Sequence, residues 1–341
     1  MTIGGLVTLA QVSALPKAEL HLHIEGTLEP ELAFRLAARN GVTLRYQDTA
    51  SLRRAYQFSD LSSFLALYYE CMAVLRTAED FADLATAYLA KARADGVTRA
   101  EMFFDPQMHI ARGVPLRTVM DGLRAAADKS AAAGGPRAEL IACFLRDRGP
   151  ADAMKTLESL SDYAGQLLGV GLDSAEVGYP PADFARVFDT ARGLGLHTVA
   201  HAGEEGPPEY VWQALDLLGV ERIDHGIRSV EDPALLRRLA ADGTPLTVCP
   251  LSNVRLRAVD TLADHPLPAM LAAGLNVSVN SDDPAYFGGY VDDNFTQLSA
   301  VFDLSDFDKA RLAANSVHSS FASEERKAEL LAELNGREVS D

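Results

Sequence analysis

The chain has 341 residues, 48% of them hydrophobic, and its 48 acidic and 31 basic residues give a formal net charge of -17. So negative a surface repels phosphate backbones and anionic lipids, which excludes nucleic acids and membranes as expected partners. Three scattered cysteines and the lack of a signal peptide or membrane-span pattern predict a cytoplasmic protein with reduced thiols.

Eight apolar runs alternate with amphipathic stretches along the chain, which predicts βα units and a parallel sheet. Eight such units predict an α/β fold, a (β/α)8 TIM barrel. Residues 1–341 are expected to form this barrel as a single domain, because barrels of this kind often exceed about 250 residues. The predicted strands are 19–24, 100–104, 140–145, 169–172, 198–201, 222–225, 246–249 and 276–280.

The first connection, residues 27–96, is unusually long and holds helical patterns over 61–75 and 79–94. Beside a barrel mouth, an insertion of this length predicts a helical lid. Apolar residues in Phe58–Leu65 could cover a planar ligand, although helix packing is the interpretation we favour for most of them. Residues 291–341 again show helical patterns, and they predict extra helices at the C-terminus.

Four polar clusters follow the C-terminal ends of predicted strands, where a barrel carries its chemistry. His21 and His23 close the first strand, and residues two apart point to one face, so both imidazoles can meet the same ion. His201 closes the fifth strand and Asp282 the eighth. Three imidazoles and one carboxylate suit zinc, which lowers the pKa of bound water to about 7.

Three further residues are candidates for proton transfer and substrate binding. Glu204 is the candidate proton donor, because desolvation can keep a carboxyl group protonated near pH 7. His225 is the candidate that orients or deprotonates the attacking water, and Asp283 is expected to accept a hydrogen bond from the substrate. Each cluster alone could be a strand-ending turn, but four of them at four strand ends favour a site.

These motifs resemble those of the adenosine/adenine deaminase family of metal-dependent hydrolases, from residue 20 to about residue 318. The resemblance implies a (β/α)8 barrel that removes ammonia from C6 of a purine and leaves a 6-oxopurine. It implies one zinc ion, with Glu204 protonating N1, His225 assisting the water and Asp283 contacting N7. The implied zinc ligands are His21, His23, His201 and Asp282.

Two positions depart from the usual adenosine deaminase pattern. Glu25 stands where those enzymes usually have Asp near the ribose, and Glu176 stands where they usually have Gly near N3. Both carboxylates would narrow the ribose space, and one could accept the ring N–H that a nucleoside lacks. This resembles the adenine deaminase branch, so we expect adenine to be converted to hypoxanthine in purine salvage. The alternative is that Glu176 turns away and bonds a neighbour in the barrel.

Other interpretations stay open at this point. The substrate could instead be adenosine or an N6-substituted adenine, because the sequence does not show the room around N6. A metal-stabilised binding protein is the alternative of another class, and the presence of Glu204 and His225 argues against it. His109 is a weaker candidate for contact with the substrate or the lid. A purine base is the expected partner, and a homo-oligomer is left open.

Overall fold

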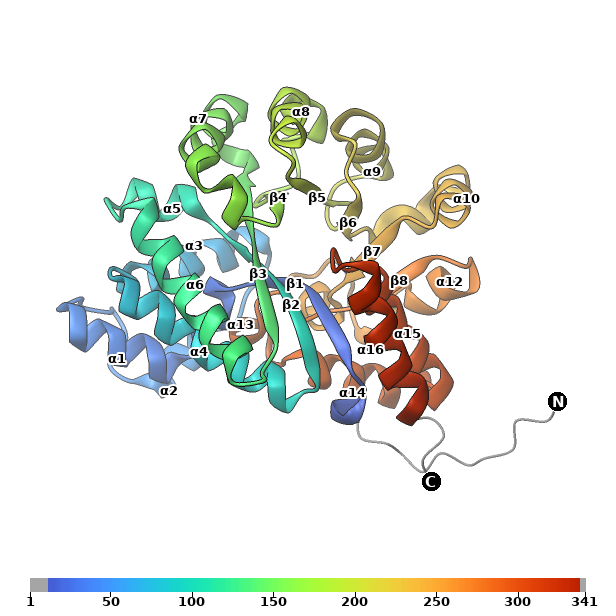
Figure 1. Ribbon diagram of the computed structural model, residues 1–341, viewed down its shortest axis with the longest axis horizontal. Helices are drawn as coiled ribbons and strands as arrows, with labels where there is room; N and C mark the ends of the chain where they lie inside the picture. The colour runs from blue at the N-terminus through green and yellow to red at the C-terminus, as the bar shows by residue number, and fades with distance from the viewer. Residues whose placement is uncertain (1–11, 338–341) are drawn as a thin grey trace.

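The computed structural model describes residues 12–337. Eight parallel strands follow in sequence order, each hydrogen-bonded to the next (Figure 1). The strands are β1 (Lys17–His23), β2 (Val97–Phe104), β3 (Arg137–Leu145), β4 (Gly169–Asp173), β5 (His197–Ala202), β6 (Arg222–His225), β7 (Pro245–Val248) and β8 (Asn276–Val279).

The barrel is closed between β1 and the residues that follow β8. The N–H of Asp282 donates to the carbonyl of His21 (3.1 Å), and the N–H of His23 donates to the carbonyl of Asp282 (3.0 Å). These two bonds bring the first strand and the segment after the last strand side by side. The closure therefore places the acidic segment after β8 directly against the H-x-H segment of β1.

The predicted (β/α)8 barrel is confirmed, since each strand overlaps a predicted run. The main differences lie at the strand starts: β2 begins at Val97 rather than residue 100, and β3 begins at Arg137 rather than residue 140. Arg99 pairs with Arg137 at this end of the barrel. Backbone pairing thus continues through polar residues that an apolar pattern does not reveal.

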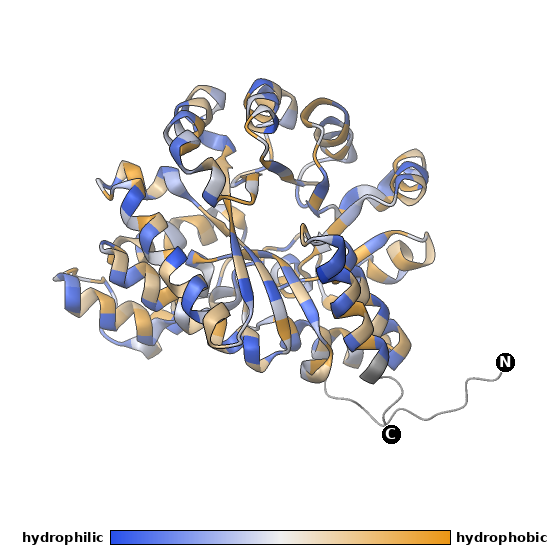
Figure 2. Cartoon of the chain, in the orientation of Figure 1, coloured by the Kyte–Doolittle hydropathy of each residue, from blue (hydrophilic) through white to orange (hydrophobic). Residues whose placement is uncertain are grey.

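Helices surround the strands, and hydrophobic and hydrophilic residues alternate along them (Figure 2). In α6, for example, the residues Val119, Leu123 and Ala126 recur at helical spacing and are buried. The helices up to β8 are α1 (Pro30–Asn40), α2 (Thr49–Ala55), α3 (Leu61–Cys71), α4 (Ala78–Ala94), α5 (Pro106–Ala111), α6 (Leu116–Ala132), α7 (Pro150–Leu160), α8 (Ala185–Gly193), α9 (Pro208–Gln213), α10 (Pro233–Asp242), α11 (Pro250–Arg255) and α12 (Leu267–Ala272).

The predicted insertion, residues 27–96, holds α1 to α4. The predicted helix over 61–75 consists of α3 followed by a short 3-10 turn, Met72–Val74. Asp60 caps α3 by accepting a hydrogen bond from the N–H of Ser63 (2.7 Å), while the Ser63 hydroxyl contacts the backbone N–H of Asp60. This capping box fixes where α3 starts, beside the barrel mouth.

The C-terminal region is helical as predicted, as far as the structure describes it. It holds α13 (Pro284–Phe287), α14 (Val291–Phe302), α15 (Asp306–His318) and α16 (Glu324–Arg337). Ser316 and Asn315 of α15 hydrogen-bond to the backbone of Ala18 in β1 (2.9 Å) and Val277 in β8 (2.9 Å), so α15 lies along the closure. Residues 1–11 and 338–341 of the predicted domain lie outside the described residues. None of the described helices is long and apolar enough to cross a membrane.

A buried carboxyl group inside the barrel makes stability depend on pH. The Glu19 side chain accepts hydrogen bonds from the hydroxyls of Tyr88 (2.7 Å) and Ser281. Burial raises the pKa of Glu19 from 4.5 to about 7. Because the folded pKa is the higher one, the proton stabilises the fold fully below pH 4.5, and this contribution is lost as the pH rises through 7.

We therefore expect Glu19→Gln to remove most of this pH dependence. The wild-type protein should lose about 3 kcal/mol of unfolding free energy between pH 4.5 and pH 8 through this group, and the variant should not. Denaturant unfolding at both pH values measures the difference. Glu158→Gln, at an exposed position, is the control. Equal pH slopes for wild type and Glu19→Gln would contradict the assignment.

Candidate metal centre and active site

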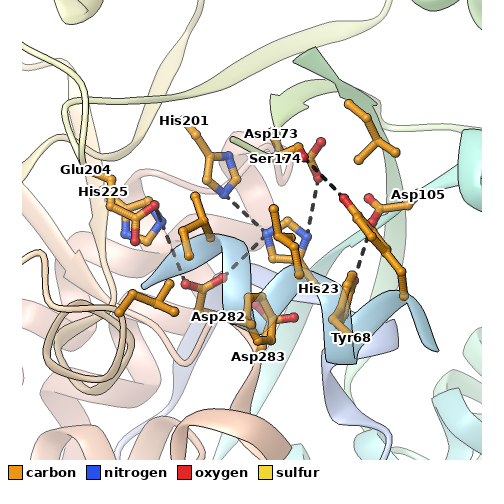
Figure 3. A pocket seen from close by; sticks show the side chains of 16 residues that line it. His23, Tyr68, Asp105, Asp173, Ser174, His201, Glu204, His225, Asp282 and Asp283 are labelled. Atoms are coloured by element: carbon orange, nitrogen blue, oxygen red, sulfur yellow. Dashed lines mark hydrogen bonds and ion pairs between the residues drawn. The ribbon is translucent and has the colours of Figure 1, made fainter. Parts of the chain in front are cut away.

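Three histidines and one aspartate converge at the C-terminal end of the barrel. The Nε2 atom of His23 lies 3.3 Å from Nε2 of His201 and 3.5 Å from Oδ1 of Asp282. The Nε2 atom of His21 lies 3.4 Å from the same Asp282 oxygen. All four candidate ligand atoms lie within 4.8 Å of one another. Figure 3 shows His23, His201 and Asp282 turned toward a common point.

This cluster fits a divalent metal ion. Metal–ligand bonds of about 2.0–2.1 Å in a tetrahedron place neighbouring ligand atoms roughly 3.3 Å apart, close to the separations found here. The four side chains are buried, and Nε2 of His21 makes no hydrogen bond within residues 12–337. An ion would satisfy that nitrogen and would hold the two facing nitrogens of His23 and His201. The predicted ligands thus form a buried cluster that could hold a metal ion.

The outer nitrogens of two of these rings have polar partners. The Nδ1 atom of His21 contacts the Thr247 hydroxyl (3.0 Å), which donates to the carboxylate of Asp224 (2.9 Å). The other Asp224 oxygen lies 3.7 Å from Nδ1 of His201. Partners of this kind fix ring orientation and raise the basicity of the metal-binding nitrogen. Asp224, which directly precedes His225, is therefore placed to orient the rings of two candidate metal ligands.

Backbone strain gathers around the same cavity. Ser174, His225 and Asp282 have φ values of 70°, 61° and 63°, in the left-handed region that disfavours residues with a side chain. All three line the cavity above the metal site. Such conformations persist only where the surrounding structure enforces them, and they cluster at functional sites. For Asp282, the two backbone bonds to β1 hold the strained residue in place.

The candidate proton donor and the candidate water-assisting residue lie together beside the candidate metal ligands. The Oε2 atom of Glu204 is 3.4 Å from Nε2 of His225, which is 3.7 Å from Oδ2 of Asp282. Burial, and then the charge of Asp282, raise the pKa of Glu204 well above its ordinary value, which favours the protonated form of this carboxyl group. Burial lowers the pKa of His225, so its ring is neutral.

A third side chain, Asn253 of α11, was not singled out in the sequence. Its Nδ2 atom lies 3.2 Å from Nδ1 of His225 and 3.5 Å from Oε1 of Glu204. Its Oδ1 atom contacts Nε2 of His265 (3.2 Å). Asn253 thus directs Nε2 of His225 toward Asp282. The signal that could have pointed to Asn253 is its position just after the seventh strand. It was missed because residues 250–253 contain no ionisable side chain.

The cavity that these groups share is partly roofed by α3. Leu61, Phe64 and Leu65 of this helix line it, together with Leu256 after α11. These three residues are placed where they could cover a ligand, whereas Phe58 packs against Phe64 (5.3 Å between ring centroids), in line with the favoured helix-packing interpretation. Apolar walls next to a metal site suit a flat aromatic substrate.

Comparison with known proteins agrees with this geometry. A family model described as adenosine deaminase matches residues 16–336. The chain belongs to the adenosine deaminase family. Within it, the chain is 63% identical over 322 residues to a protein of Streptomyces coelicolor named adenine deaminase, which covers 94% of this chain and 95% of that protein.

Solved structures of this family are also similar. A crystal structure of adenine deaminase from Arthrobacter aurescens has a TM-score of 0.94 and 57% identity, covering 96% of this chain and all of that one (100%). A crystal structure of an amidohydrolase from Burkholderia ambifaria with bound Zn has a TM-score of 0.88 and 28% identity, covering 98% and 94%. The likeness to both extends over the whole barrel.

Glu176, one of the two departures from the adenosine deaminase pattern, does not face the cavity. Its Oε1 atom accepts a hydrogen bond from the N–H of Gly203 (2.6 Å). Its Oε2 atom accepts three more, from residues 204, 205 and 206 (3.1, 2.8 and 2.8 Å). Four amide donors thus draw the carboxylate under the loop that carries Glu204. The expected contact with the sugar edge of a purine is corrected, and the alternative, a bond to a barrel neighbour, describes Glu176.

Glu25, the other departure, also lies behind the cavity wall. Its Oε1 atom is 2.6 Å from Nε2 of His109 and accepts the N–H of Asp105 (3.2 Å). Arg112 in turn contacts Nδ1 of His109 (2.6 Å). Neither Glu25 nor His109 lines the cavity, so the expectation that they contact the substrate directly is corrected.

Asp283 lies beside Asp282 and lines the cavity as predicted. Burial, and then the charge of Asp282, raise the pKa of Asp283 well above its ordinary value. The expectation that Asp283 accepts a hydrogen bond from the substrate stays a prediction. Gly26 makes room for it, because a Cβ at residue 26 would lie 2.0 Å from Oδ1 of Asp283. The close approach of Asp283, a cavity-lining residue, thus requires the glycine of the H-x-H-x-x-G motif.

Proposed function

We propose that this chain hydrolyses adenine to hypoxanthine and ammonia at a single zinc ion, in purine salvage. The observation that carries the proposal is the pairing, in one buried cavity, of four candidate metal ligands with the carboxyl group of Glu204, whose pKa is raised by burial. The near full-length relatives named adenine deaminase support adenine as the substrate. The zinc ligands would be His21, His23, His201 and Asp282.

Each residue around the cavity has a separate task in this reaction. Zinc, when bound, supplies an activated water near neutral pH. Glu204 donates its proton to N1 of the purine, which makes C6 more electrophilic. His225, held by Asn253, presents Nε2 to the attacking water and orients it. Asp283 donates a hydrogen bond to N7 and so fixes the orientation of the purine ring in the cavity.

The choice of zinc rests on the ligands and on a relative. Three imidazoles and one carboxylate form a mixed nitrogen and oxygen set that zinc accepts readily. The amidohydrolase from Burkholderia ambifaria, 28% identical to this chain, has bound Zn. The cytoplasm is the proposed location, in keeping with three cysteines that are free and buried.

A substrate panel with the zinc-loaded protein tests the proposed function. We expect adenine to lose its absorbance maximum and to release one ammonia per base, while adenosine reacts far more slowly. N6-methyladenine reports the room around N6, because its hydrolysis releases methylamine instead of ammonia. A higher kcat/KM with adenosine or with N6-methyladenine than with adenine would overturn the proposal. An inactive protein that binds purines would favour the binding-protein alternative.

A further inference from the structure

Carboxyl groups that the proposed mechanism does not use gather at one side of the cavity. Asp105 follows β2, and Asp173 ends β4. Both are buried, and both line the cavity. In Figure 3 they lie on the far side of His23 from Glu204 and His225. The substrate edge remote from the proton donor would therefore face acidic side chains.

Asp105 is held firmly, and one of its oxygens is left without a donor. Its backbone N–H donates to Glu25 (3.2 Å), and its Oδ2 atom accepts the hydroxyl of Tyr68 (3.5 Å). The Oδ1 atom receives no hydrogen bond from any residue within 12–337, although the side chain is only 1% exposed. A buried oxygen of this kind is unfavourable unless a ligand supplies the missing donor.

The other acidic groups nearby have partners or another task. Asp173 lies 3.6 Å from Nδ1 of His23, so it serves to orient a metal ligand. Glu25 and Glu176 are bound by residues behind the cavity wall, as described above. Asp283 is assigned to N7 of the purine. Asp173 and Asp283 each also have an Oδ1 atom without a hydrogen bond within residues 12–337, so Asp105 is distinguished from them as the cavity-lining aspartate that has no other assigned task.

The shape of a purine places a donor near Asp105. With N1 at Glu204, C6 at the metal site and N7 at Asp283, the ring nitrogen N9 lies at the end of the molecule remote from Glu204. In a free base this end can carry an N–H, whereas in a nucleoside the sugar replaces that hydrogen. We propose that Asp105 is the residue that selects the free base, by accepting this ring N–H through Oδ1. This inference rests on the proposed function and assigns its specificity.

A nucleoside would be disfavoured for two reasons at this position. It leaves Oδ1 of Asp105 buried without a donor, and sites built around a hydrogen bond discriminate strongly against analogues that lack it. Its sugar would also have to enter the wall formed by Asp105 and Tyr68, which is 2% exposed. A methyl group on N9 removes the same hydrogen with little added bulk, so 9-methyladenine isolates the first effect.

The test compares adenine with 9-methyladenine in zinc-loaded wild type, Asp105→Asn and Asp105→Ala. We expect wild type to prefer adenine strongly. In Asp105→Ala, the ratio of the two kcat/KM values should fall roughly 10- to 150-fold, mainly through lost adenine activity. Asp105→Asn keeps the size of the side chain and should give a smaller fall. Asp147→Asn, an exposed aspartate near the same barrel end, is the control that should keep the wild-type ratio.

The outcomes separate the inference from the proposed function. If the wild type releases no ammonia from adenine, the proposed function fails, and the inference fails with it. If the wild type deaminates adenine and 9-methyladenine equally well, the inference fails while the function stands. The inference also fails if both Asp105 variants lower the two activities by the same factor, because that is the result of a purely structural role.

Discussion

Glu204→Gln is expected to lower kcat for adenine about 10²- to 10⁴-fold, which is the usual contribution of a positioned general acid. Gln keeps the size and polarity of Glu but has no carboxyl proton to give to N1. Because Glu204 is not among the predicted metal ligands, the metal content should stay at one ion per chain. Steady-state kinetics and metal analysis on the same preparation measure both quantities.

Glu205→Gln is the matched control for this prediction. Glu205 follows Glu204 on the same loop, and its backbone N–H binds Glu176 in the same way (2.8 Å). Its side chain does not line the cavity, so the same chemical change there should leave kcat within about twofold of the wild-type value. An active Glu204→Gln variant, or an equal loss in both variants, would show that Glu204 is not the proton donor.

Removal of the metal is expected to abolish activity and to destabilise the fold. Chelation takes away the group that activates water and leaves the buried imidazoles of His21, His23 and His201 facing one another. If the free ion is normally at about 1,000 times its Kd, its loss costs about 4 kcal/mol of unfolding free energy. Thermal unfolding and deamination should both recover when zinc is added back.

Two variants locate this effect at the proposed ligands. His201→Ala should prevent metal binding and reconstitution, because it removes one of the four ligands. His318→Ala, at an exposed position in α15, should retain the metal and full activity. A metal-free preparation that deaminates adenine at the full rate would contradict the assignment of the whole site.

The positions of the strands could be predicted from the sequence because each strand contains a short run rich in apolar residues. The same regularity placed His21, His23, His201 and Asp282 at one end of the barrel, since parallel strands share a polarity. The closure between Asp282 and β1 follows from the topology rather than from any local pattern. It is visible only once all eight strands are assembled.

Side-chain direction in the loops could not be predicted in the same way. The sequence shows that Glu176 is acidic and near the mouth, but its orientation depends on amide donors from residues 203–206. The orientation of Glu25 likewise depends on a contact with His109, which lies 84 positions away in the sequence. Asp105 was not singled out in the sequence, because nothing local shows that one of its oxygens lacks a donor. These side-chain orientations are determined by contacts between residues that are far apart in the sequence.

The backbone bonds that join Asp282 to β1 have a mechanical consequence. Asp282 would bind the ion through its carboxylate, and its peptide group hydrogen-bonds to β1. A bound cation would therefore cross-link the two segments that close the barrel. Strand β1 and the segment after β8 then cannot separate without breaking metal–ligand bonds. Loss of the ion and opening of the barrel should accordingly occur in one cooperative step, which begins at the contact between β1 and Asp282.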